Sequence, residues 1–204
     1  MAGTFITFEG IDGAGKTTQI ELFTARLTAE GRSVLRTREP GGDAIAEAIR
    51  SVVLDRSLQP MEALTEAYLY AASRAQHVRQ VLLPALDAGK TVLCDRFLDS
   101  SLAYQGYGRM LGAERVLAIN REAVGELEPD WTVMLLLDPS EARARMHTKK
   151  LDRIEAERLD FHQRVYEGFR EIALKHPQRV FLADAALPVE KLSEMIYAAW
   201  KSRG

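Results

Sequence analysis

A glycine-rich loop close to the N-terminus limits what this chain can fold into more than any other feature. Gly10, Gly15, Lys16 and Thr17 occupy the fixed positions of the pattern G-x-x-x-x-G-K-[ST]. Glycines let the backbone curl until successive N–H groups point at one anion, and a helix after the loop turns its positive end toward the same anion. A glycine-rich turn without a ligand is the alternative, but such a turn has no use for the Lys-Thr pair. The pattern therefore predicts a phosphate-binding loop.

The segments on either side of this loop come in the order that the interpretation requires. Residues 4–9 form an apolar run typical of a short strand, and residues 17–28 have the amphipathic pattern of a helix. In such loops the Lys reaches the terminal phosphates and the Thr hydroxyl binds Mg²⁺. We expect the phosphates to lie against Gly10, Ile11, Asp12, Gly13, Ala14, Gly15, Lys16, Thr17 and Thr18. The predicted core positions of the helix are Ile20, Phe23, Ala25 and Leu27.

Length and composition indicate one domain over residues 1–204 and exclude several classes of protein. Hydrophobic residues make up 47% of the chain, and the formal net charge is -2. This charge balance argues against a nucleic-acid-binding protein. No apolar run approaches the ~20 residues that span a membrane, and no secretory signal is visible. We expect a cytoplasmic enzyme without a membrane partner, in which the lone Cys94 packs in the interior.

Predicted strands alternate with predicted helices along the whole chain. The strands are expected at residues 4–9, 33–37, 91–95, 131–137 and 179–182. Long helices are expected over residues 61–86, which Pro84 bends or ends, and over residues 155–175. This order predicts an α/β, P-loop-type three-layer fold with a five-stranded parallel sheet and helices on both faces. Ligands of such sheets bind at the carboxyl ends of the strands, where we find Glu9, Arg38, Asp95 and Asp138.

Charged residues beside two of these strand ends suggest a second phosphate site. Arg96 follows Asp95, so that the acid can hold Mg²⁺ while the guanidinium captures a phosphate with two hydrogen bonds. Arg38 opens a Pro-Gly-Gly loop after another strand. A buried Asp–Arg pair and a surface arginine are the structural alternatives. Asp12 would repel bound phosphates unless a metal ion or an acceptor hydroxyl lies between them.

Six cations gather between two of the predicted helices, at Arg143, Arg145, Lys149, Lys150, Arg153 and Arg158. A mobile basic lid over about residues 143–158 would close over a transferring phosphoryl group and exclude water. One lid arginine would add the stabilisation that arginine fingers supply. A solvated helix face would explain the same charges.

Aromatic and amide side chains provide a candidate site for a planar base. Tyr70 and Arg74 are four residues apart on one helix face, where a ring and a guanidinium can hold a base by stacking and hydrogen bonding. Gln105 has an amide that donates and accepts at once, as reading a pyrimidine edge requires. A half-buried tyrosine beside an intrahelical neighbour is the alternative. The four histidines show no metal-ligand spacing.

Three segments of the sequence resemble the thymidylate kinase family. They are residues 9–18 (Glu-Gly-Ile-Asp-Gly-Ala-Gly-Lys-Thr-Thr), 37–42 (Thr-Arg-Glu-Pro-Gly-Gly) and 95–105 (Asp-Arg-Phe-x-x-Ser-Ser-x-Ala-Tyr-Gln). Residues 151–155 (Leu-Asp-Arg-Ile-Glu) also resemble the lid of bacterial members. The resemblance covers essentially the whole chain. It implies transfer of the ATP γ-phosphoryl group to dTMP, which yields dTDP and ADP, with Mg²⁺ as cofactor and a homodimer as the assembly.

The resemblance also implies roles for individual residues. Lys16 and Thr17 would hold ATP and Mg²⁺, and Asp12 and Glu39 would lie near the sugar 3′-hydroxyl and the reacting phosphates. Gly13 stands where some members carry a catalytic arginine, so this chain would depend on a lid cation. The implied catalytic residues are Lys16, Asp12, Arg96 and Arg153, with Thr17 and Asp95 as the Mg²⁺ ligands.

The implied dTMP site combines residues from several segments. Arg38 and Arg96 would bind the phosphate, and Tyr104 would crowd the 2′ position and so favour deoxyribose. Tyr70 stands where Phe is common and would stack on thymine. Arg74, Ser101 and Gln105 would read the base edge, which completes the set Glu39, Arg38, Tyr70, Arg74, Arg96, Ser101, Tyr104 and Gln105.

Two other functions remain open at this point. A kinase for another nucleotide or deoxynucleoside would use the same loop, and the base-contact set does not exclude dUMP. A nucleotide-dependent switch on the same fold would hydrolyse or exchange nucleotide slowly and would need no second phosphate site. Product formation with and without dTMP separates these functions.

Overall fold

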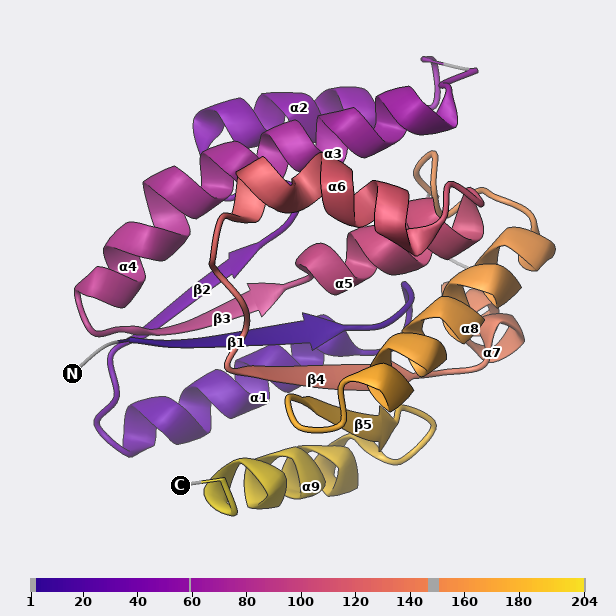
Figure 1. The fold of residues 1–204 in the computed structure, drawn as a ribbon. Helices are drawn as coiled ribbons and strands as arrows, with labels where there is room; N and C mark the ends of the chain where they lie inside the picture. Colours follow the sequence, from indigo (N-terminus) through magenta and orange to yellow (C-terminus); the bar gives the residue numbers. More distant parts are fainter. Residues whose placement is uncertain (1–2, 59, 147–150, 204) are drawn as a thin grey trace.

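The sheet at the centre of the molecule has the predicted number of strands, all parallel (Figure 1). The computed structural model describes residues 3–58, 60–146 and 151–203. The strand order is β2-β3-β1-β4-β5. The strands are β1 Thr4–Glu9, β2 Val34–Arg38, β3 Thr91–Asp95, β4 Trp131–Leu136 and β5 Val180–Asp184.

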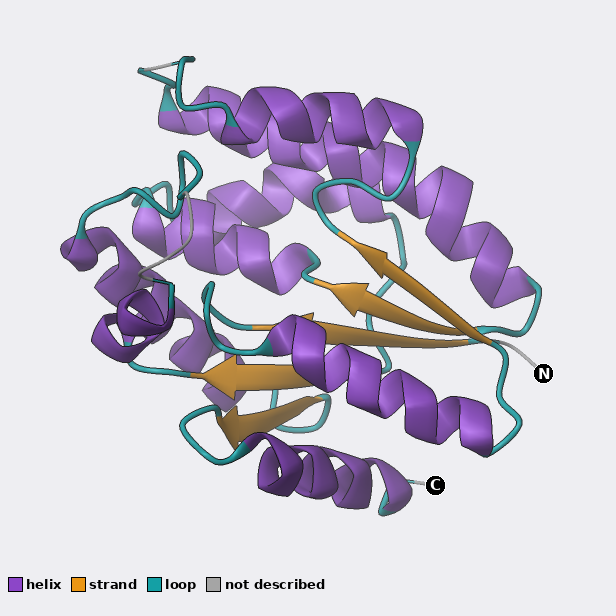
Figure 2. Cartoon of the chain, turned by 180° about the vertical axis from the view of Figure 1, so that it is seen from behind, coloured by secondary structure: helices purple, strands orange, loops and turns teal. Residues whose placement is uncertain are grey.

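Helices cover both faces of this sheet, which confirms the predicted three-layer α/β fold. One face carries α1 (Lys16–Ala29) and α9 (Val189–Lys201), which pack against each other (Figures 1 and 2). The other helices are α2 Ala44–Leu54, α3 Ala63–His77, α4 Leu83–Asp87, α5 Leu98–Ser101, α6 Ala113–Val124, α7 Pro139–Arg145 and α8 Leu159–Lys175. Two π-helical segments, Val78–Leu82 and Leu102–Gly108, continue α3 and α5.

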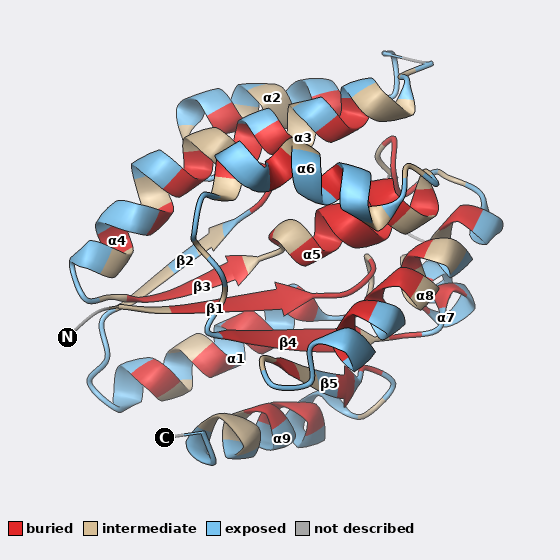
Figure 3. Ribbon diagram, in the orientation of Figure 1, coloured by how far each residue is buried: buried red, intermediate tan, exposed pale blue. Residues whose placement is uncertain are grey.

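The central strands are buried on both faces, as strands of a covered parallel sheet must be (Figure 3). In α1 the predicted core residues Ile20, Phe23 and Leu27 are buried. The prediction for Ala25 was wrong, since this residue is exposed. It lies two positions from both Phe23 and Leu27, about 200° around the helix from each, and so faces away from the sheet.

Pro84 does not end the long helix predicted over residues 61–86. The chain instead makes the π-helical turn Val78–Leu82 and continues through the proline into α4. Proline has no N–H for the carbonyl four residues before it, and its ring clashes with that carbonyl. The wider turn accommodates this defect, so the helix runs on to Asp87.

The helix predicted from residue 155 begins four residues later, at Leu159. The Asp152 carboxylate accepts hydrogen bonds from the backbone N–H groups of Ile154 and Glu155, at 2.8 and 2.9 Å. A side chain that satisfies these donors holds the segment as a turn, because it competes with the helical pattern.

The carboxyl ends of the strands meet along one edge of the sheet. Phe8 of β1 and Arg38 of β2 both pair in register with Asp95 of β3. Glu9 and Asp138 follow at the ends of β1 and β4. No helix in the described part of the chain combines the length and the apolar character needed to cross a bilayer.

Candidate active site

The loop between β1 and α1 has a shape that only glycine permits at two of its positions. Gly10 and Gly13 have positive φ values of 135° and 84°. A Cβ atom on Gly10 would lie 2.2 Å from the carbonyl oxygen of Leu135, and one on Gly13 would lie 2.7 Å from that of Ala142. The loop is therefore packed closely against β4 and α7.

The N-terminus of α1 has the features of an anion site. Gly15 caps the helix without a side-chain hydrogen bond, and the first turn carries no acidic residue. Lys16 is buried, and its Nζ donates to the carbonyl oxygens of Gly10 and Ile11, both at 3.0 Å. Burial and the neighbouring Arg96 charge lower the pKa of Lys16. The helix dipole and the ammonium group thus lie at the same end of the loop.

Thr17 and Asp95 form a pair of oxygen donors beside this loop. The Thr17 hydroxyl donates to Oδ2 of Asp95 at 3.3 Å, while Oδ1 of Asp95 is buried without a partner in the described residues. Hydroxyl and carboxylate oxygens suit Mg²⁺, which keeps most of its waters and needs few protein ligands. No group of three or more His, Cys, Asp or Glu side chains in the described residues could hold a metal ion.

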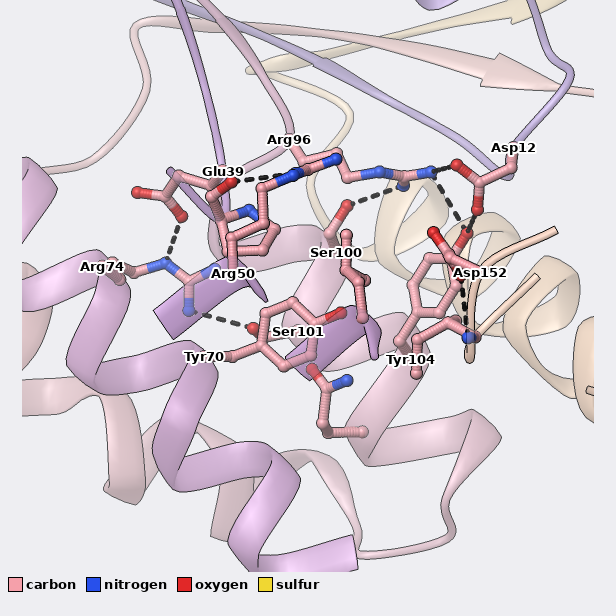
Figure 4. A pocket seen from close by; sticks show the side chains of 14 residues that line it. Asp12, Glu39, Arg50, Tyr70, Arg74, Arg96, Ser100, Ser101, Tyr104 and Asp152 are labelled. Atoms are coloured by element: carbon pink, nitrogen blue, oxygen red, sulfur yellow. Dashed lines mark hydrogen bonds and ion pairs between the residues drawn. The ribbon is translucent and has the colours of Figure 1, made fainter. Parts of the chain in front are cut away.

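Arg96 connects the end of β3 to the phosphate loop. Its φ of 72° is left-handed, which costs a residue with a Cβ about 1 kcal/mol or more. In this conformation its guanidinium donates to the Gly10 carbonyl oxygen and to Asp12 Oδ1, both at 2.7 Å, and to Ser100 Oγ at 3.1 Å (Figure 4). The strained backbone therefore aims a cation at the place where the loop and the strand ends meet.

Asp12 lies between two cations and a hydroxyl. Burial alone would raise the pKa of Asp12, but the charges of Arg96 and Lys16 outweigh it and hold that pKa well below its usual range. The Tyr104 hydroxyl donates to Asp12 Oδ2 at 2.9 Å. The carboxylate thus stays ionised inside the loop, with cations on both sides that limit its repulsion of a phosphate.

Arg74 has its guanidinium almost fully occupied by protein acceptors. Its Nε donates to Glu39 Oε2 at 2.7 Å, and its terminal nitrogens donate to Ser101 Oγ, Asn120 Oδ1 and the carbonyl oxygen of Phe97. Only 2% of Arg74 is exposed. Four of the five N–H groups of a guanidinium are thus used, which leaves one for a ligand.

Seven of the eight residues predicted for the dTMP site line one pocket. The pocket has an empty volume of about 500 Å³ and lies between α2, α3, α5 and the segment before α8 (Figure 4). The seven residues are Glu39, Tyr70, Arg74, Arg96, Ser101, Tyr104 and Gln105. The remaining residue, Arg38, lies outside this pocket, is half exposed and donates to Glu47 Oε2 at 2.9 Å.

A second pocket of about 1110 Å³ follows the phosphate loop. Gly13, Lys16, Thr17, Arg38 and Asp95 line it. The two pockets share the wall formed by Asp12, Glu39, Arg50, Arg96 and Asp152. A molecule in each pocket would therefore meet its neighbour beside two arginines.

The lid segment approaches the second pocket with only some of its predicted cations. Arg145 lines that pocket and donates to the carbonyl oxygen of Ala185, whereas Arg158 is exposed. Arg153 is buried against α2 and α3, where it donates to the Val53 carbonyl oxygen and faces Glu66 at 2.8 Å. It does not contact the phosphate loop in this conformation. Lys149 and Lys150 lie outside the described residues.

Sequence reasoning missed Arg50, which lines both pockets and donates to the carbonyl oxygen of Pro40 at 2.9 Å. A usable signal was present, because Arg50 shares a helix face with Ala46 and Val53, the buried residues of α2. A cation on an inward face is a candidate for a site. Sequence reasoning also missed Asn120, whose only hint is a polar residue at a buried position of α6.

The fold and these two pockets define the class of the protein. A phosphate-binding loop, a Thr–Asp oxygen pair and a further pocket behind shared arginines are the parts of a P-loop nucleotide kinase, in which two phosphorylated molecules meet. A switch would need only the pocket along the phosphate loop. The kinase interpretation is therefore favoured over the switch.

Comparisons with known proteins give the particular family. The family model described as thymidylate kinase matches residues 8–196. The thymidylate kinase of Exiguobacterium sibiricum is 53% identical over 94% of this chain and 91% of the relative, and that of Lactobacillus delbrueckii subsp. bulgaricus is 49% identical over 98% and 95%. The crystal structure of thymidylate kinase from Ehrlichia chaffeensis matches with a TM-score of 0.81 and 30% identity, covering 98% of this chain and 99% of that one. The chain belongs to the thymidylate kinase family and is an ATP-dependent kinase.

Proposed function

We propose a division of roles among the residues of a chain that uses ATP to phosphorylate dTMP to dTDP. The observation that carries the proposal is the shared wall of the two pockets, which contains Asp12, Glu39, Arg50, Arg96 and Asp152. ATP occupies the pocket along the phosphate loop, and dTMP occupies the pocket lined by Tyr70 and Gln105. The reacting phosphates then meet at the wall, beside Arg50 and Arg96.

The donor side of the site holds and polarises the ATP phosphates. The loop backbone and the N-terminus of α1 supply N–H donors, and Lys16 leaves the carbonyls of Gly10 and Ile11 to reach the terminal phosphates. Thr17 and Asp95 would hold Mg²⁺, with the free Oδ1 of Asp95 as the available donor. The metal ion neutralises phosphate charge when it is bound.

The acceptor side positions a nucleophile that needs no strong base. The second pKa of a phosphate monoester is about 6, so the attacking oxygen of dTMP is largely ionised at pH 7. Arg96 and Arg50 hold this phosphate from inside the pocket, and Arg38 approaches from the second pocket. The catalytic task is to hold two anions in line and to neutralise the charge between them.

The base of dTMP lies against α3 and the segment that follows β3. Tyr70 stacks on the ring, and the one free N–H of Arg74 donates to a base carbonyl. Ser101 and Gln105 read the remaining edge. Tyr104, fixed by Asp12 and Arg96, takes the space of a 2′-hydroxyl and so favours deoxyribose.

We propose that residues 143–158 act as a lid over the reacting phosphates. Arg145, Met146, Asp152 and Glu155 of this segment already line the second pocket. Arg153 is the proposed lid cation, and it reaches the phosphoryl group only after its ion pair with Glu66 opens. Closure of the lid excludes water from the transfer step.

The proposed assembly is a homodimer formed through the outer surface of α2, α3 and α6. These three helices lie side by side on one face of the molecule (Figure 1). Their exposed large apolar side chains are Ile45, Val52, Tyr68 and Leu117. Apolar side chains on adjacent helices favour a contact with a second copy.

The use of ATP as the phosphoryl donor favours a cytoplasmic location for the protein.

The test of the proposed function measures ADP release from ATP and Mg²⁺ with dTMP, dUMP, UMP, CMP or AMP as the acceptor. Strong dependence on dTMP, with dTDP as the product, is the expected result. Slow ADP release that is the same with every acceptor would contradict the acceptor site.

A further inference from the structure

Glu66 is a buried carboxylate of α3 that the proposed mechanism does not use. It is 0% exposed and accepts hydrogen bonds from residues of two other segments. Gln105 Nε2 donates to its Oε1 at 2.9 Å, and Arg109 donates to both oxygens at 3.0 to 3.2 Å. Arg153 faces Oε2 at 2.8 Å. One carboxylate therefore connects the base pocket to the segment before α8.

These contacts fix which way the Gln105 amide points. The Arg109 guanidinium donates to both oxygens of Glu66, so Glu66 acts as an acceptor toward its neighbours and selects the NH₂ end of the amide. The Oε1 atom of Gln105 is left without a partner in the described residues, although only 1% of the residue is exposed. Because Gln105 lines the dTMP pocket, its amide offers an acceptor to the ligand.

An acceptor at this place distinguishes pyrimidines by the proton on N3. Thymine and uracil carry N3–H and can donate to an amide oxygen, whereas the N3 lone pair of cytosine would face it and repel it. A flipped amide would reverse this preference. Rejection by a buried polar group left unpaired is stronger than rejection by shape.

We propose that Glu66 is a positioning residue that holds Gln105 as an acceptor and so sets the selectivity for N3–H pyrimidines over cytosine. The inference rests on the proposed function, in which Gln105 reads the base edge. Glu66 itself does not line the pocket and acts through the amide that it orients.

The chain offers a matched control for the ion pair between Glu66 and Arg109. Glu157 also pairs with Arg109, through Nη1, whereas the Gln105 amide donates to Glu66. The variants Glu66→Gln and Glu157→Gln each remove one carboxylate charge from the same arginine. Only the first removes the acceptor that fixes the amide, because the amide introduced by Glu66→Gln can donate to Gln105 Oε1 and allow the flip.

The experiment measures kcat/KM for dTMP, dUMP and dCMP with the wild type and the two variants. We expect Glu66→Gln to lower the dTMP:dCMP ratio at least tenfold. The dTMP:dUMP ratio should stay within twofold, since these bases share N3–H and differ by a methyl group. Glu157→Gln should change neither ratio. An unchanged dTMP:dCMP ratio in a folded Glu66→Gln protein would overturn the inference.

Two further variants keep the test decisive. Glu66→Asp keeps a negative charge near Arg109 and Arg153 but shortens the side chain by one methylene, so that the carboxylate no longer reaches Gln105. If Glu66→Gln does not fold, Glu66→Asp should lower the dTMP:dCMP ratio at least threefold. An unchanged ratio in this variant would count against the inference. Gln105→Ala tests the proposed function on which it rests. If Gln105→Ala lowers the ratio and neither Glu66 variant does, only the role of Glu66 fails; if Gln105→Ala also has no effect, the base-reading role of Gln105 fails as well.

Discussion

Lys16, Asp12 and Arg96 illustrate how far single residues could be predicted from the sequence. A fixed position of the phosphate loop specifies Lys16, Asp12 lies inside that loop, and Arg96 was found at the end of a predicted strand; the structure brings all three to one pocket. Arg50 was missed although its position on the inward face of α2 was a usable signal. Asn120 was missed because its role depends on Arg74, which packs against it from another helix and which local pattern does not reveal. Arg153 was predicted by resemblance, but its present partner, Glu66, is a contact between distant segments.

The role of Lys16 can be tested by removing its ammonium group. Lys16→Ala should lower kcat by about 10³-fold, the scale at which loss of a preorganised charge donor acts. The melting temperature should change little, since Lys16 bonds only to carbonyls of its own loop. Lys191→Ala on the exposed side of α9 is the control and should keep full activity. Near-normal turnover by Lys16→Ala would refute the mechanism.

Glu9 makes a prediction about stability and pH. Burial and the nearby Asp99 carboxylate raise the pKa of Glu9 from 4.5 to about 7. The native state thus binds this proton more tightly than the unfolded chain does, so the contribution of Glu9 to stability is complete below about pH 4.5 and is lost as the pH rises through 7.

Glu9→Gln should remove this dependence. Its amide oxygen still accepts from the Phe97 N–H, and it cannot ionise. The difference in the free energy of unfolding between variant and wild type, measured with urea at pH 5, 6, 7 and 8, should move in favour of the variant as the pH rises. Glu62→Gln, a substitution outside the site, serves as the reference. A difference that is flat across this range would show that Glu9 is ionised throughout.

At the scale of the elements, type and order were predictable, and boundaries depended on single contacts. Apolar runs and helical periodicity found every strand of the described sheet. The predicted start of α8 was wrong because the Asp152 side chain holds a turn there. The long helix predicted over residues 61–86 was found, but the π-helical turn that carries it through Pro84 was not predicted, because such a turn has no sequence signature of its own.

The loop between β1 and α1 should be far less tolerant of a methyl group than other turns. Gly10→Ala adds a contact of 2.2 Å with the Leu135 carbonyl oxygen to a backbone strain at φ 135°. Gly31→Ala has the strain alone, at φ 81° with nothing within 4 Å. We expect a loss of about 1 kcal/mol for Gly31→Ala and about 3 kcal/mol for Gly10→Ala in urea unfolding. Equal losses would show that the loop can move away from β4.

The inward face of α2 should contribute to acceptor binding through Arg50. Arg50→Gln removes a charge from the wall shared by the two pockets and should raise the KM for dTMP about tenfold or more, because charged hydrogen bonds contribute about 1.5–3 kcal/mol. Arg56→Gln, at an exposed position just beyond the helix, is the matched control. Steady-state kinetics with both substrates varied provides the measurement. A KM for dTMP that does not change would remove Arg50 from the site.

For the whole molecule, the alternation of strands and helices was enough to predict the class of fold. Each parallel pair needs a crossover, so this order of elements leaves few other arrangements. The order β2-β3-β1-β4-β5 was not predictable, because it depends on which helix faces complement each other across the sheet. The site followed from the fold, since parallel strands bring their carboxyl ends to one edge.

The proposed dimer should dissociate when its apolar surface is charged. The double variant Ile45→Glu and Leu117→Glu places carboxylates on α2 and α6 and should sediment as a monomer in analytical ultracentrifugation. Val189→Glu changes an apolar residue of similar exposure on α9, across the sheet, and should leave the dimer intact. A wild-type chain that sediments as a monomer at micromolar concentration would refute this assembly.

Two cations of the site are already hydrogen-bonded to the protein before a nucleotide binds. Arg96 pairs with Asp12, and Lys16 donates to carbonyl oxygens of its own loop. The cations already hold protein oxygens, and the incoming phosphates take over these places. Binding is therefore an exchange of hydrogen-bond partners within the site. Such a site attracts anions only weakly from a distance, because among the described residues the five cations that line the phosphate-loop pocket are matched by five carboxylates before encounter. The quality of fit after contact, and with it the dissociation rate, then governs which nucleotide stays long enough to react.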